Sequence, residues 1–386
     1  MRILVAAGGT GGHIYPALAV VAQLRSTSAA DLELRWIGGH RGLEQEIVPR
    51  AGLRLERLWL RSLRTVNVSL PTLLDPVRLL ASMPQALALL LRRRPDVIYS
   101  TGGYVAIPVL AAAALLRIPA LLWEGNQVPG RSVRAIAGLA RARSVAFSAT
   151  QPQLPAPTYV TGTPIRDVSQ LDPVEARTRL GLPPDLPVLL VFGGSQAVRR
   201  LNEAMADALG DLVERCAVVH ISGAGAYAQA ESLRQSLAPA MRARYRPFAF
   251  LHEDMGAALA AADLLVGRAG SSTLAEAAAA GLPMIVIPYP HAAAHQRANA
   301  AELVEAGGAL MVDDETLGGD TLREACDLLF DPRLAAMAAA ARRVGRPGAA
   351  TVTAQLLLAL AAGDALPPED RVEAMTRQTA PQTVAS

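Results

Sequence analysis

The sequence contains no lysine, and all 37 basic residues are arginine. This absence excludes mechanisms that need a lysine, such as Schiff-base chemistry, a pyridoxal enzyme or a Walker-A phosphate loop. Only two cysteines are present, Cys216 and Cys326. They are too few for a disulfide scaffold and lack the spacing of a metal site. Aromatic residues make up only 4% of the chain, which disfavours a nucleic-acid-binding surface built on base stacking.

Long uninterrupted hydrophobic runs are also missing. The longest apolar stretch, residues 105–123, is broken by Pro108, Arg117 and Pro119, so it cannot form a clean span of about 20 apolar residues. The N-terminal apolar run reaches glycines too soon for the core of a signal peptide. We therefore expect a soluble protein whose contact with a membrane is at most peripheral.

What the chain does contain is enough apolar sequence for two domains. Its 386 residues are 51% hydrophobic, and its net charge is +3. That net charge conceals an asymmetry, because residues 1–163 hold 18 arginines and 8 acidic residues, whereas residues 164–386 hold 19 arginines and 26 acidic residues. Such a split favours a first half that faces a polyanion or an anionic membrane, and compositional drift is the alternative.

Short branched apolar runs alternate with glycine turns and helical stretches in both halves of the chain. Residues 3–6 and 97–99 show the pattern in the first half, and residues 188–192 and 264–266 show it in the second. Fully apolar strands that alternate with helices predict parallel sheets covered on both faces. We expect two doubly wound, Rossmann-like α/β domains facing a cleft, over residues 1–163 and 164–348, then a helix at 349–362 and a flexible tail at 363–386.

The first glycine turn, Gly8-Gly9-Thr10-Gly11-Gly12, is followed by His13. Glycines between a strand and a helix let backbone N–H groups approach an anion, so this turn is a candidate binding site. A dinucleotide site is disfavoured, because the required register places Ile14 where a glycine is needed. A tight turn without a ligand is the other interpretation.

Two similar turns occur in the second half. In Gly193-Gly194-Ser195-Gln196, Ser195 either caps the next helix or binds a phosphate. In residues 270–276, Thr273 and Glu276 either form a capping box or leave the Glu276 carboxylate to accept hydrogen bonds from sugar hydroxyls.

A further polar stretch follows at residues 291–299. His291 and His295 have the spacing of a helical zinc pair but lack a third ligand, so no metal is expected. On a helix, Gln296 and Asn299 share a face and are candidates to point into the cleft.

Residues 50–94 combine nine arginines and two acidic residues with apolar side chains. An apolar surface edged with arginine is typical of a peripheral membrane face. We expect Trp59, Leu60, Arg61 and Arg64 to belong to this face. The alternative is that the leucines are core and the arginines are merely solvated.

Together these motifs resemble the MurG family of inverting glycosyltransferases, which complete the lipid-linked precursor of the bacterial cell wall. The resemblance extends from Arg2 to about Ala362. It is carried by seven stretches in the family's order, namely residues 8–17, 101–105, 124–126, 160–166, 193–196, 270–283 and 291–299. The family usually has His-Glu-Gln-Asn where this chain has Trp123-Glu124-Gly125-Asn126, a departure that concerns the acceptor contacts.

The resemblance implies a GT-B fold in which the helix at 349–362 returns to the N-terminal domain. It also implies transfer of N-acetylglucosamine (GlcNAc) from UDP-GlcNAc to the 4-hydroxyl of undecaprenyl-diphospho-N-acetylmuramoyl-pentapeptide, a step of peptidoglycan biosynthesis. No tightly bound cofactor and no metal are implied. The implied location is peripheral, at the cytoplasmic face of the cell membrane, with an anionic membrane surface and other cell-wall synthesis proteins as partners and no nucleic acid.

The resemblance also assigns site residues. Donor-binding positions in the second domain are Arg166, Ser195, the uracil position His252, the turn Ser271, Ser272, Thr273, Leu274, Ala275 and Glu276, and Gln296 with Asn299. Within that turn, Glu276 is implied to accept the ribose hydroxyls, and Gln296 to contact GlcNAc. In the first domain, Thr10, Gly11, Gly12 and Asn126 match positions that meet the transferred sugar or the acceptor.

Inversion requires a general base that takes the proton of the acceptor hydroxyl while UDP leaves. His13 is the first candidate, because histidine ordinarily titrates near neutral pH, and Glu124 is the second. His13 could instead only hold the glycine turn. Alternative functions are transfer to another lipid or glycoside acceptor, a UDP-sugar epimerase, and a non-catalytic nucleotide-sugar-binding protein.

Overall fold

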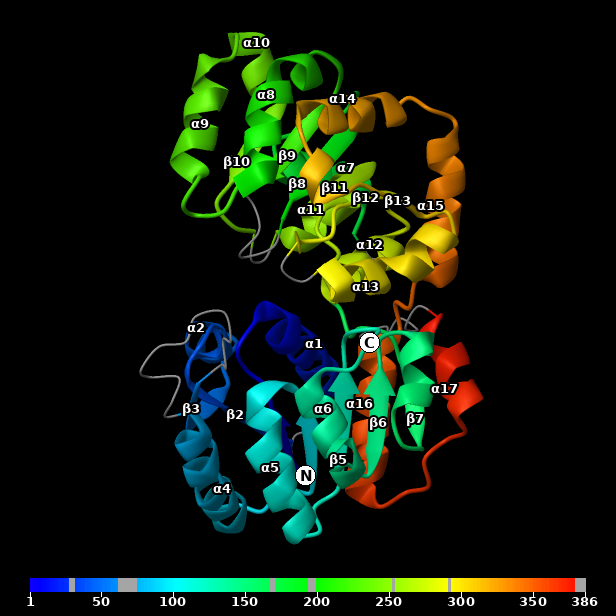
Figure 1. Ribbon diagram of the computed structural model, residues 1–386. Helices are drawn as coiled ribbons and strands as arrows, with labels where there is room; N and C mark the ends of the chain where they lie inside the picture. The colour runs from blue at the N-terminus through cyan, green and yellow to red at the C-terminus, as the bar shows by residue number, and fades with distance from the viewer. Residues whose placement is uncertain are drawn as a thin grey trace, which may run out of the picture. The chain divides into compact units, whose positions relative to one another are not determined.

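The computed structural model describes residues 1–27, 32–61, 75–166, 171–193, 199–251, 254–290 and 293–378. The chain forms two compact units. Unit 1 comprises Met1–Ile165 and Pro347–Ser386, and unit 2 comprises Arg166–Arg346. Each unit is built on one parallel sheet with helices around it (Figure 1), which confirms the expectation of two Rossmann-like α/β domains. The division falls between Ile165 and Arg166, whereas the sequence placed it between Thr163 and Pro164.

Unit 1 contains a seven-stranded sheet with the order β3-β2-β1-β4-β5-β6-β7. Its strands are β1 (Arg2–Ala6), β2 (Glu33–Arg41), β3 (Arg54–Arg61), β4 (Val97–Ser100), β5 (Ala120–Glu124), β6 (Ala142–Val145) and β7 (Thr158–Val160). Its α-helices are α1 (Gly11–Thr27), α2 (Glu44–Arg50), α4 (Asp75–Arg92), α5 (Gly103–Leu115), α6 (Arg131–Ile136), α16 (Ala349–Ala362) and α17 (Glu369–Thr376), and its 3₁₀ helices are η1 (Ala137–Leu139) and η2 (Ser148–Gln153).

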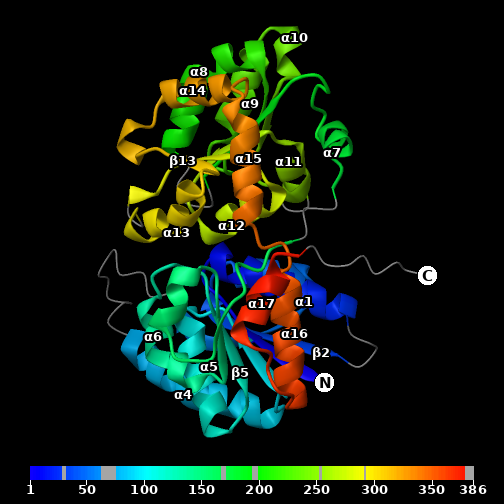
Figure 2. The same ribbon diagram turned by 90° about the vertical axis from the view of Figure 1, so that its right-hand side faces the viewer.

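Strand β1, in the interior of the sheet of unit 1, is buried on both faces. Ile3 and Val5 of β1 belong to the core on the side of α1 and α16, whereas Leu4 and Ala6 belong to the core on the side of α4, α5 and α6. Figure 2 shows α1, α16 and α17 grouped apart from α4, α5 and α6. This arrangement explains why the strand sequence is continuously apolar instead of alternating.

Unit 2 contains a six-stranded sheet with the order β10-β9-β8-β11-β12-β13. Its strands are β8 (Val188–Phe192), β9 (Ala217–Ile221), β10 (Tyr245–Phe248), β11 (Leu264–Gly267), β12 (Met284–Val286) and β13 (Ala309–Met311). Its α-helices are α7 (Pro173–Arg179), α8 (Arg199–Arg215), α9 (Tyr227–Ser236), α10 (Pro239–Arg242), α11 (Met255–Ala261), α12 (Ser271–Ala280), α13 (Ala293–Glu305), α14 (Gly319–Leu328) and α15 (Arg333–Val344), with the 3₁₀ helix η4 (Asp314–Thr316).

Unit 2 repeats the two-faced burial of unit 1. Leu189 and Val191 of β8 pack with α8 and α14, whereas Val188 and Leu190 pack with α7, α11 and α12 on the other face. Both sheets are therefore covered on both sides, as the apolar runs of the sequence predict.

The prediction of a flexible tail from residue 363 onward is wrong for α17. Val372 of this helix is fully buried in unit 1. The Glu369 carboxylate accepts hydrogen bonds from the Thr158 N–H at 3.0 Å and from the Gln151 side-chain amide at 2.7 Å. These contacts fix a segment that is too polar to be recognised as structured from its composition.

Across the part of the chain that the structure describes, no helix is both long enough and apolar enough to cross a membrane.

Both sheets have a topological switch point, where successive connections leave in opposite directions. It lies between β1 and β4 in unit 1 and between β8 and β11 in unit 2. Ligands of open α/β sheets bind outside the carboxyl ends of the strands at such points. In unit 1 the glycine turn 8–12 follows β1, and in unit 2 residues 268–276 follow β11. The fold therefore places both turns at the edge of their own sheet where ligands bind.

Candidate active site

The first glycine turn leads directly into α1, which begins at Gly11. Thr10 and Gly12 are exposed, and the backbone N–H of His13 donates to the Thr10 carbonyl at 3.1 Å. The N–H of Gly9 is not open to a ligand, because it donates to the Glu44 carboxylate at 2.9 Å. The turn thus presents Thr10, Gly11 and Gly12 outward while its inner side is held by a carboxylate.

His13 is held by the segment that follows β4. Its Nδ1 lies 2.6 Å from the Thr101 carbonyl oxygen, and the Thr101 hydroxyl donates to the His13 carbonyl at 2.9 Å. A carbonyl only accepts hydrogen bonds, so Nδ1 carries the proton and Nε2 of the neutral ring keeps a lone pair. Nε2 points beside Gly103, where a Cβ atom would lie 3.6 Å from it. Both sequence-based interpretations of His13, as a base and as a structural contact, are compatible with this geometry.

Glu124 lies at the end of β5 and is buried. One carboxylate oxygen accepts from the Asn126 N–H at 2.8 Å and from its side-chain amide at 3.0 Å. The other oxygen accepts from the Gly130 N–H at 2.9 Å. The carboxylate therefore organises the loop that carries Asn126. Position 125 requires a glycine, because a Cβ atom there would collide with the Trp123 ring.

In unit 2, α12 begins at Ser271 with Gly270 as its N-cap, and no side chain caps this end. The capping-box interpretation of Thr273 and Glu276 is therefore wrong, because both residues lie inside the helix. Ser272 Oγ is buried and has no hydrogen-bond partner among the described residues. Backbone N–H groups at a helix N-terminus, together with this hydroxyl, form a suitable contact for an anionic group.

Glu276 projects from α12 beside Arg166. The Arg166 Nε lies 3.5 Å from the Glu276 carboxylate, and the Glu276 side chain is 13% exposed. Burial raises the pKa of Glu276 above its usual range, and the Arg166 guanidinium opposes this shift. A carboxylate that is partly desolvated and beside a cation is suited to accept hydrogen bonds from ligand hydroxyls.

The remaining turn and helix residues differ in accessibility. Leu274 and Asn299 are buried, so the side chain of Leu274 is a core residue and only its backbone could meet a ligand. Gln296 is partly exposed, and its side-chain oxygen accepts from the Tyr289 N–H at 2.8 Å. Asn299 lies one turn further along α13.

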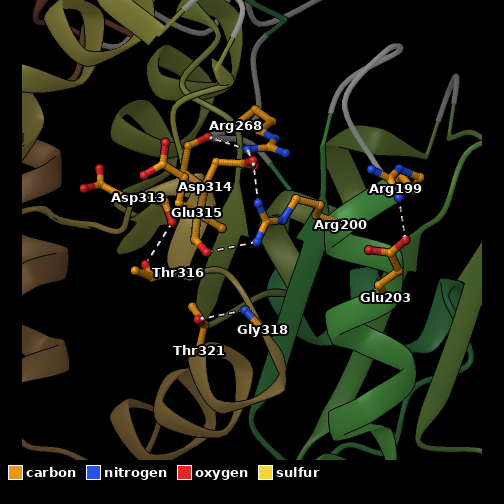
Figure 3. A network of polar contacts seen from close by, with 11 residues as sticks. Arg199, Arg200, Glu203, Arg268, Asp313, Asp314, Glu315, Thr316, Gly318 and Thr321 are labelled. Carbon is orange, nitrogen blue, oxygen red and sulfur yellow. Dashed lines mark hydrogen bonds and ion pairs between the residues drawn. The ribbon is translucent and has the colours of Figure 1, made fainter.

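A polar network that the sequence analysis missed lies beside the turn at residues 268–276. Arg268 follows β11 and pairs with Asp314 at 2.5 Å, and Arg200 of α8 pairs with the same carboxylate at 3.4 Å (Figure 3). The Arg268 guanidinium also lies 5.5 Å from the centre of the Tyr289 ring. Asp314 thus fixes two arginines near the carboxyl ends of β8 and β11. No local motif marks this network, because its members are distant in sequence.

His220 forms a second network at the start of α8. Its Nδ1 lies 2.7 Å from the Tyr245 hydroxyl, and its Nε2 lies 2.9 Å from the Asn202 side-chain oxygen. The Asn202 amide nitrogen donates to the Ser222 carbonyl, so Nε2 of His220 carries the proton. Burial lowers the pKa of His220 to about 4. This neutral histidine ties the beginning of α8 to the end of β9.

Several predicted residues lie outside the described residues, namely Ser195, His252, His291 and Arg64. His295 is exposed on α13. In the described ranges, no three His, Cys, Asp or Glu side chains gather in an arrangement that could hold a metal ion.

The predicted membrane face needs a correction. Trp59 is 49% exposed, but Leu60 is only 4% exposed and belongs to the core beneath α4 and α5. The side chains of β3 alternate between the two sides of the sheet, so Leu58 and Leu60 turn inward while Trp59 turns outward. The inclusion of Leu60 is therefore wrong. No side-chain position is described for Arg61.

The comparisons with known proteins agree with the fold. Residues 3–144 match the N-terminal domain of glycosyltransferase family 28, and residues 188–354 match its C-terminal domain. The crystal structure of MurG from Acinetobacter baumannii is similar with a TM-score of 0.72 and 28% identity, covering 92% of this chain and 99% of that chain. Two parallel-sheet units with these domains define a glycosyltransferase of the GT-B fold, as expected.

The curated relatives narrow the class. The UDP-N-acetylglucosamine--N-acetylmuramyl-(pentapeptide) pyrophosphoryl-undecaprenol N-acetylglucosamine transferase of Moorella thermoacetica is 40% identical, covering 93% of this chain and 98% of the relative. The protein of the same name from Chlorobium luteolum is 39% identical, with coverages of 94% and 99%. The chain belongs to this family of N-acetylglucosamine transferases, which confirms the resemblance found in the sequence.

Proposed function

We propose that the chain transfers GlcNAc from UDP-GlcNAc to the 4-hydroxyl of N-acetylmuramic acid in undecaprenyl-diphospho-N-acetylmuramoyl-pentapeptide, with inversion at the anomeric carbon. The reaction completes the lipid-linked precursor of peptidoglycan. The proposal rests on family membership together with the two turns. The turn in unit 1 presents His13, and the turn in unit 2 leads into α12, whose N-terminus no side chain caps.

Unit 2 binds the donor in this proposal. Glu276 accepts hydrogen bonds from the ribose hydroxyls, and the uncapped N-terminus of α12 with Ser271 to Ala275 contacts the nucleotide sugar. Arg166 lies beside Glu276 and stabilises negative charge on the leaving UDP. Ser195 and His252 contact the diphosphate and the uracil, and Gln296 with Asn299 contacts the sugar.

Unit 1 binds the acceptor and supplies the base. Because the Thr101 carbonyl accepts from His13 Nδ1–H, Nε2 is the free basic nitrogen and takes the proton of the acceptor 4-hydroxyl as the new glycosidic bond forms. The C–O bond to UDP breaks in the same displacement. Thr10, Gly11, Gly12 and Asn126 position the acceptor or the transferred sugar.

Glu124 is the weaker candidate for the base. Its two oxygens already accept three hydrogen bonds within the loop, and these bonds hold the carboxylate in place against that loop. We assign it the task of fixing Asn126.

Unit 1 also carries a surface suited to an anionic membrane. Trp59 and four large apolar side chains of α4 are exposed. We call these five residues the α4 patch: Trp59, Val77, Leu80, Met83 and Leu91. At 100° per residue, the four helical members lie within about a third of the helix circumference. The exposed arginines Arg92 and Arg93 end the helix and follow it. Apolar side chains beside arginines bind the interface of an anionic leaflet, which supports a peripheral location at the cytoplasmic face, where we propose that the lipid acceptor lies.

The test is UDP release from UDP-GlcNAc with and without the lipid-linked muramoyl acceptor. We expect release that depends on the acceptor and a disaccharide product with inverted anomeric configuration. Release that is as fast with another lipid or glycoside acceptor would contradict the proposed acceptor. Epimerisation of the sugar without any acceptor, or donor binding without turnover, would contradict transfer itself.

A further inference from the structure

A buried carboxylate in unit 1 has no part in the chemistry described so far. Glu44, the first residue of α2, is fully buried and accepts three hydrogen bonds from neutral donors. These come from the Gly9 N–H at 2.9 Å, the Gly39 N–H at 3.0 Å and the Tyr104 hydroxyl at 2.9 Å. Hydrogen bonds to a charged acceptor are the strong ones, so the carboxylate connects its three donors firmly.

The three donors come from three different strand ends. Gly9 follows β1, Gly39 lies near the end of β2, and Tyr104 is the second residue of α5, the helix that follows β4. β2, β1 and β4 are neighbours in the sheet, and their carboxyl ends form the edge at which a ligand is expected. One side chain therefore sets the relative positions of the turns along this edge.

The surrounding glycines make room for this side chain. A Cβ at Gly8 would lie 2.7 Å from the Glu44 carboxylate, a Cβ at Gly38 would lie 2.8 Å from its Cγ, and a Cβ at Gly42 would overlap the carboxylate. A glycine run after the first strand usually indicates close approach of a phosphate. Here the closest anion to the Gly9 N–H is the protein's own, and its negative charge disfavours a second anion at that position.

The same contacts reach the surroundings of His13. Gly9 precedes His13 in the turn, and Tyr104 belongs to the segment whose Thr101 binds the ring nitrogen and the carbonyl of His13. The Tyr104 hydroxyl remains a donor, since burial, and then Glu44, raise the pKa of Tyr104 far above its usual value. Both segments that hold His13 are thus fixed by one carboxylate.

We infer that Glu44 is a positioning residue for the transfer reaction: its buried carboxylate holds the turn 8–12 and the segment 101–104 so that His13 Nε2 faces the acceptor. This inference rests on the proposed function. The turn in unit 1 thus binds an anion of the protein itself at the Gly9 N–H.

The test compares Glu44→Gln with Glu46→Gln. Glu46 is the matched control, because it lies on the same helix and its side chain is 62% exposed. For Glu44→Gln we expect kcat to fall by about tenfold to a hundredfold, as displaced catalytic groups do, with the KM for UDP-GlcNAc within about twofold of the parent. Equal kcat values in the two variants would overturn the inference.

A second measurement separates this inference from the proposed function. Histidine-selective nitrogen NMR on the ligand-free protein, with His13→Asn to assign the signal, reports the tautomer of His13 without any turnover. We expect the Nδ1–H form in the parent and in Glu46→Gln, and a mixture of tautomers in Glu44→Gln. An unchanged His13 signal in Glu44→Gln overturns the positioning role even if the enzyme uses another acceptor. If Glu44→Gln does not fold, Tyr104→Phe removes one donor only, and an unchanged His13 signal in that variant overturns the role equally.

Discussion

The two units of the molecule follow one plan and yet arrange charge in opposite ways. Both have a parallel sheet with a glycine turn at its switch point. In unit 1, the more basic unit by sequence, the turn encloses the Glu44 carboxylate. In unit 2, the more acidic by sequence, the turn region has an uncapped helix end and the arginines Arg166, Arg200 and Arg268.

The difference shows that the net charge of a domain does not reveal what its site binds. The excess arginine of unit 1 includes Arg92 and Arg93 on the surface beside the α4 patch, while its first glycine turn is built around an acid. The excess acid of unit 2 is also largely on the surface, for example Asp207, Asp211 and Asp320 around Arg323. The groups that decide ligand chemistry are the few buried ones at each switch point.

The largest effect is expected when the proposed base of unit 1 is removed, which tests whether the two units have separate tasks. We expect His13→Ala to lower kcat by about 100-fold to 10,000-fold, the range ordinarily lost with a general base. UDP binding, which belongs to unit 2 in our proposal, should be unchanged in isothermal titration. Turnover near that of the parent at saturating acceptor would show that His13 is not the base.

A stability measurement probes unit 2 through His220. The pKa of His220 in the folded protein is about 4, against an ordinary value of about 6.5. Between these two pH values the unfolded chain binds a proton at His220 and the folded chain does not. The free energy of unfolding should therefore be lowered as pH falls from about 6.5 toward 4, by up to about 3 kcal/mol, and this loss should level off below that range.

The measurement is denaturant unfolding of the parent and of His220→Asn between pH 4 and pH 8. The variant lacks the proton-binding group, so its stability should depend less on pH than that of the parent. If the two proteins lose stability in parallel through this range, His220 is not the source.

Removal of the Glu276 charge should weaken donor binding. Glu276→Gln keeps the size of the side chain but loses hydrogen bonds to a charged acceptor, so we expect the Kd for UDP to rise by about tenfold to a hundredfold. The difference in Kd between the parent and the variant should be smaller at low pH. Burial raises the pKa of Glu276, so the parent is protonated at a higher pH than an ordinary glutamate. Glu324→Gln, an exposed position on α14, is the control and should bind UDP as the parent does. Equal affinity in both variants would remove Glu276 from the donor site.

The smallest expected effect concerns the membrane face of unit 1. Leu80 and Leu91 are 72% and 61% exposed, so their joint replacement by glutamine should spare the fold and reduce binding to vesicles of anionic phospholipid by about tenfold. Val174→Gln, at a 66% exposed position of unit 2, should bind vesicles as the parent does. Transfer to a soluble acceptor analogue should be equal in all three proteins. Unchanged vesicle binding of the leucine variant would contradict the membrane role of the α4 patch.

Much of the fold could be predicted because parallel strands buried on both faces leave a continuous apolar signal. Ile3–Ala6 and Val188–Phe192 are examples, and the glycine turns after them follow from the same reasoning. Local periodicity could also have corrected the prediction that Leu60 belongs to the membrane face, since Leu58 and Leu60 alternate with Trp59 as in any strand. The prediction of a capping box is wrong because the N-cap of α12 is Gly270, three residues before Thr273.

The parts of the site that sequence reasoning missed depend on contacts between distant residues. Glu44 lies 35 residues from Gly9 and 60 residues from Tyr104 along the chain, and nothing in the local pattern marks it as buried. The pairing of Arg200 with Asp314 spans 114 residues. Such contacts exist only once the strand order has brought the carboxyl ends of neighbouring strands together.

The return of α16 to unit 1 has a consequence for synthesis of the chain. Leu356 and Leu357 of α16 cover the same core as Ile3 and Val5, but residues 166–346 of unit 2 are made in between. At roughly 5 to 20 residues per second, the ribosome needs on the order of 10 to 40 seconds to make unit 2. During that interval one face of the first sheet remains without α16, while unit 2 can already fold. The half of the protein that is synthesised first is therefore the half that finishes folding last.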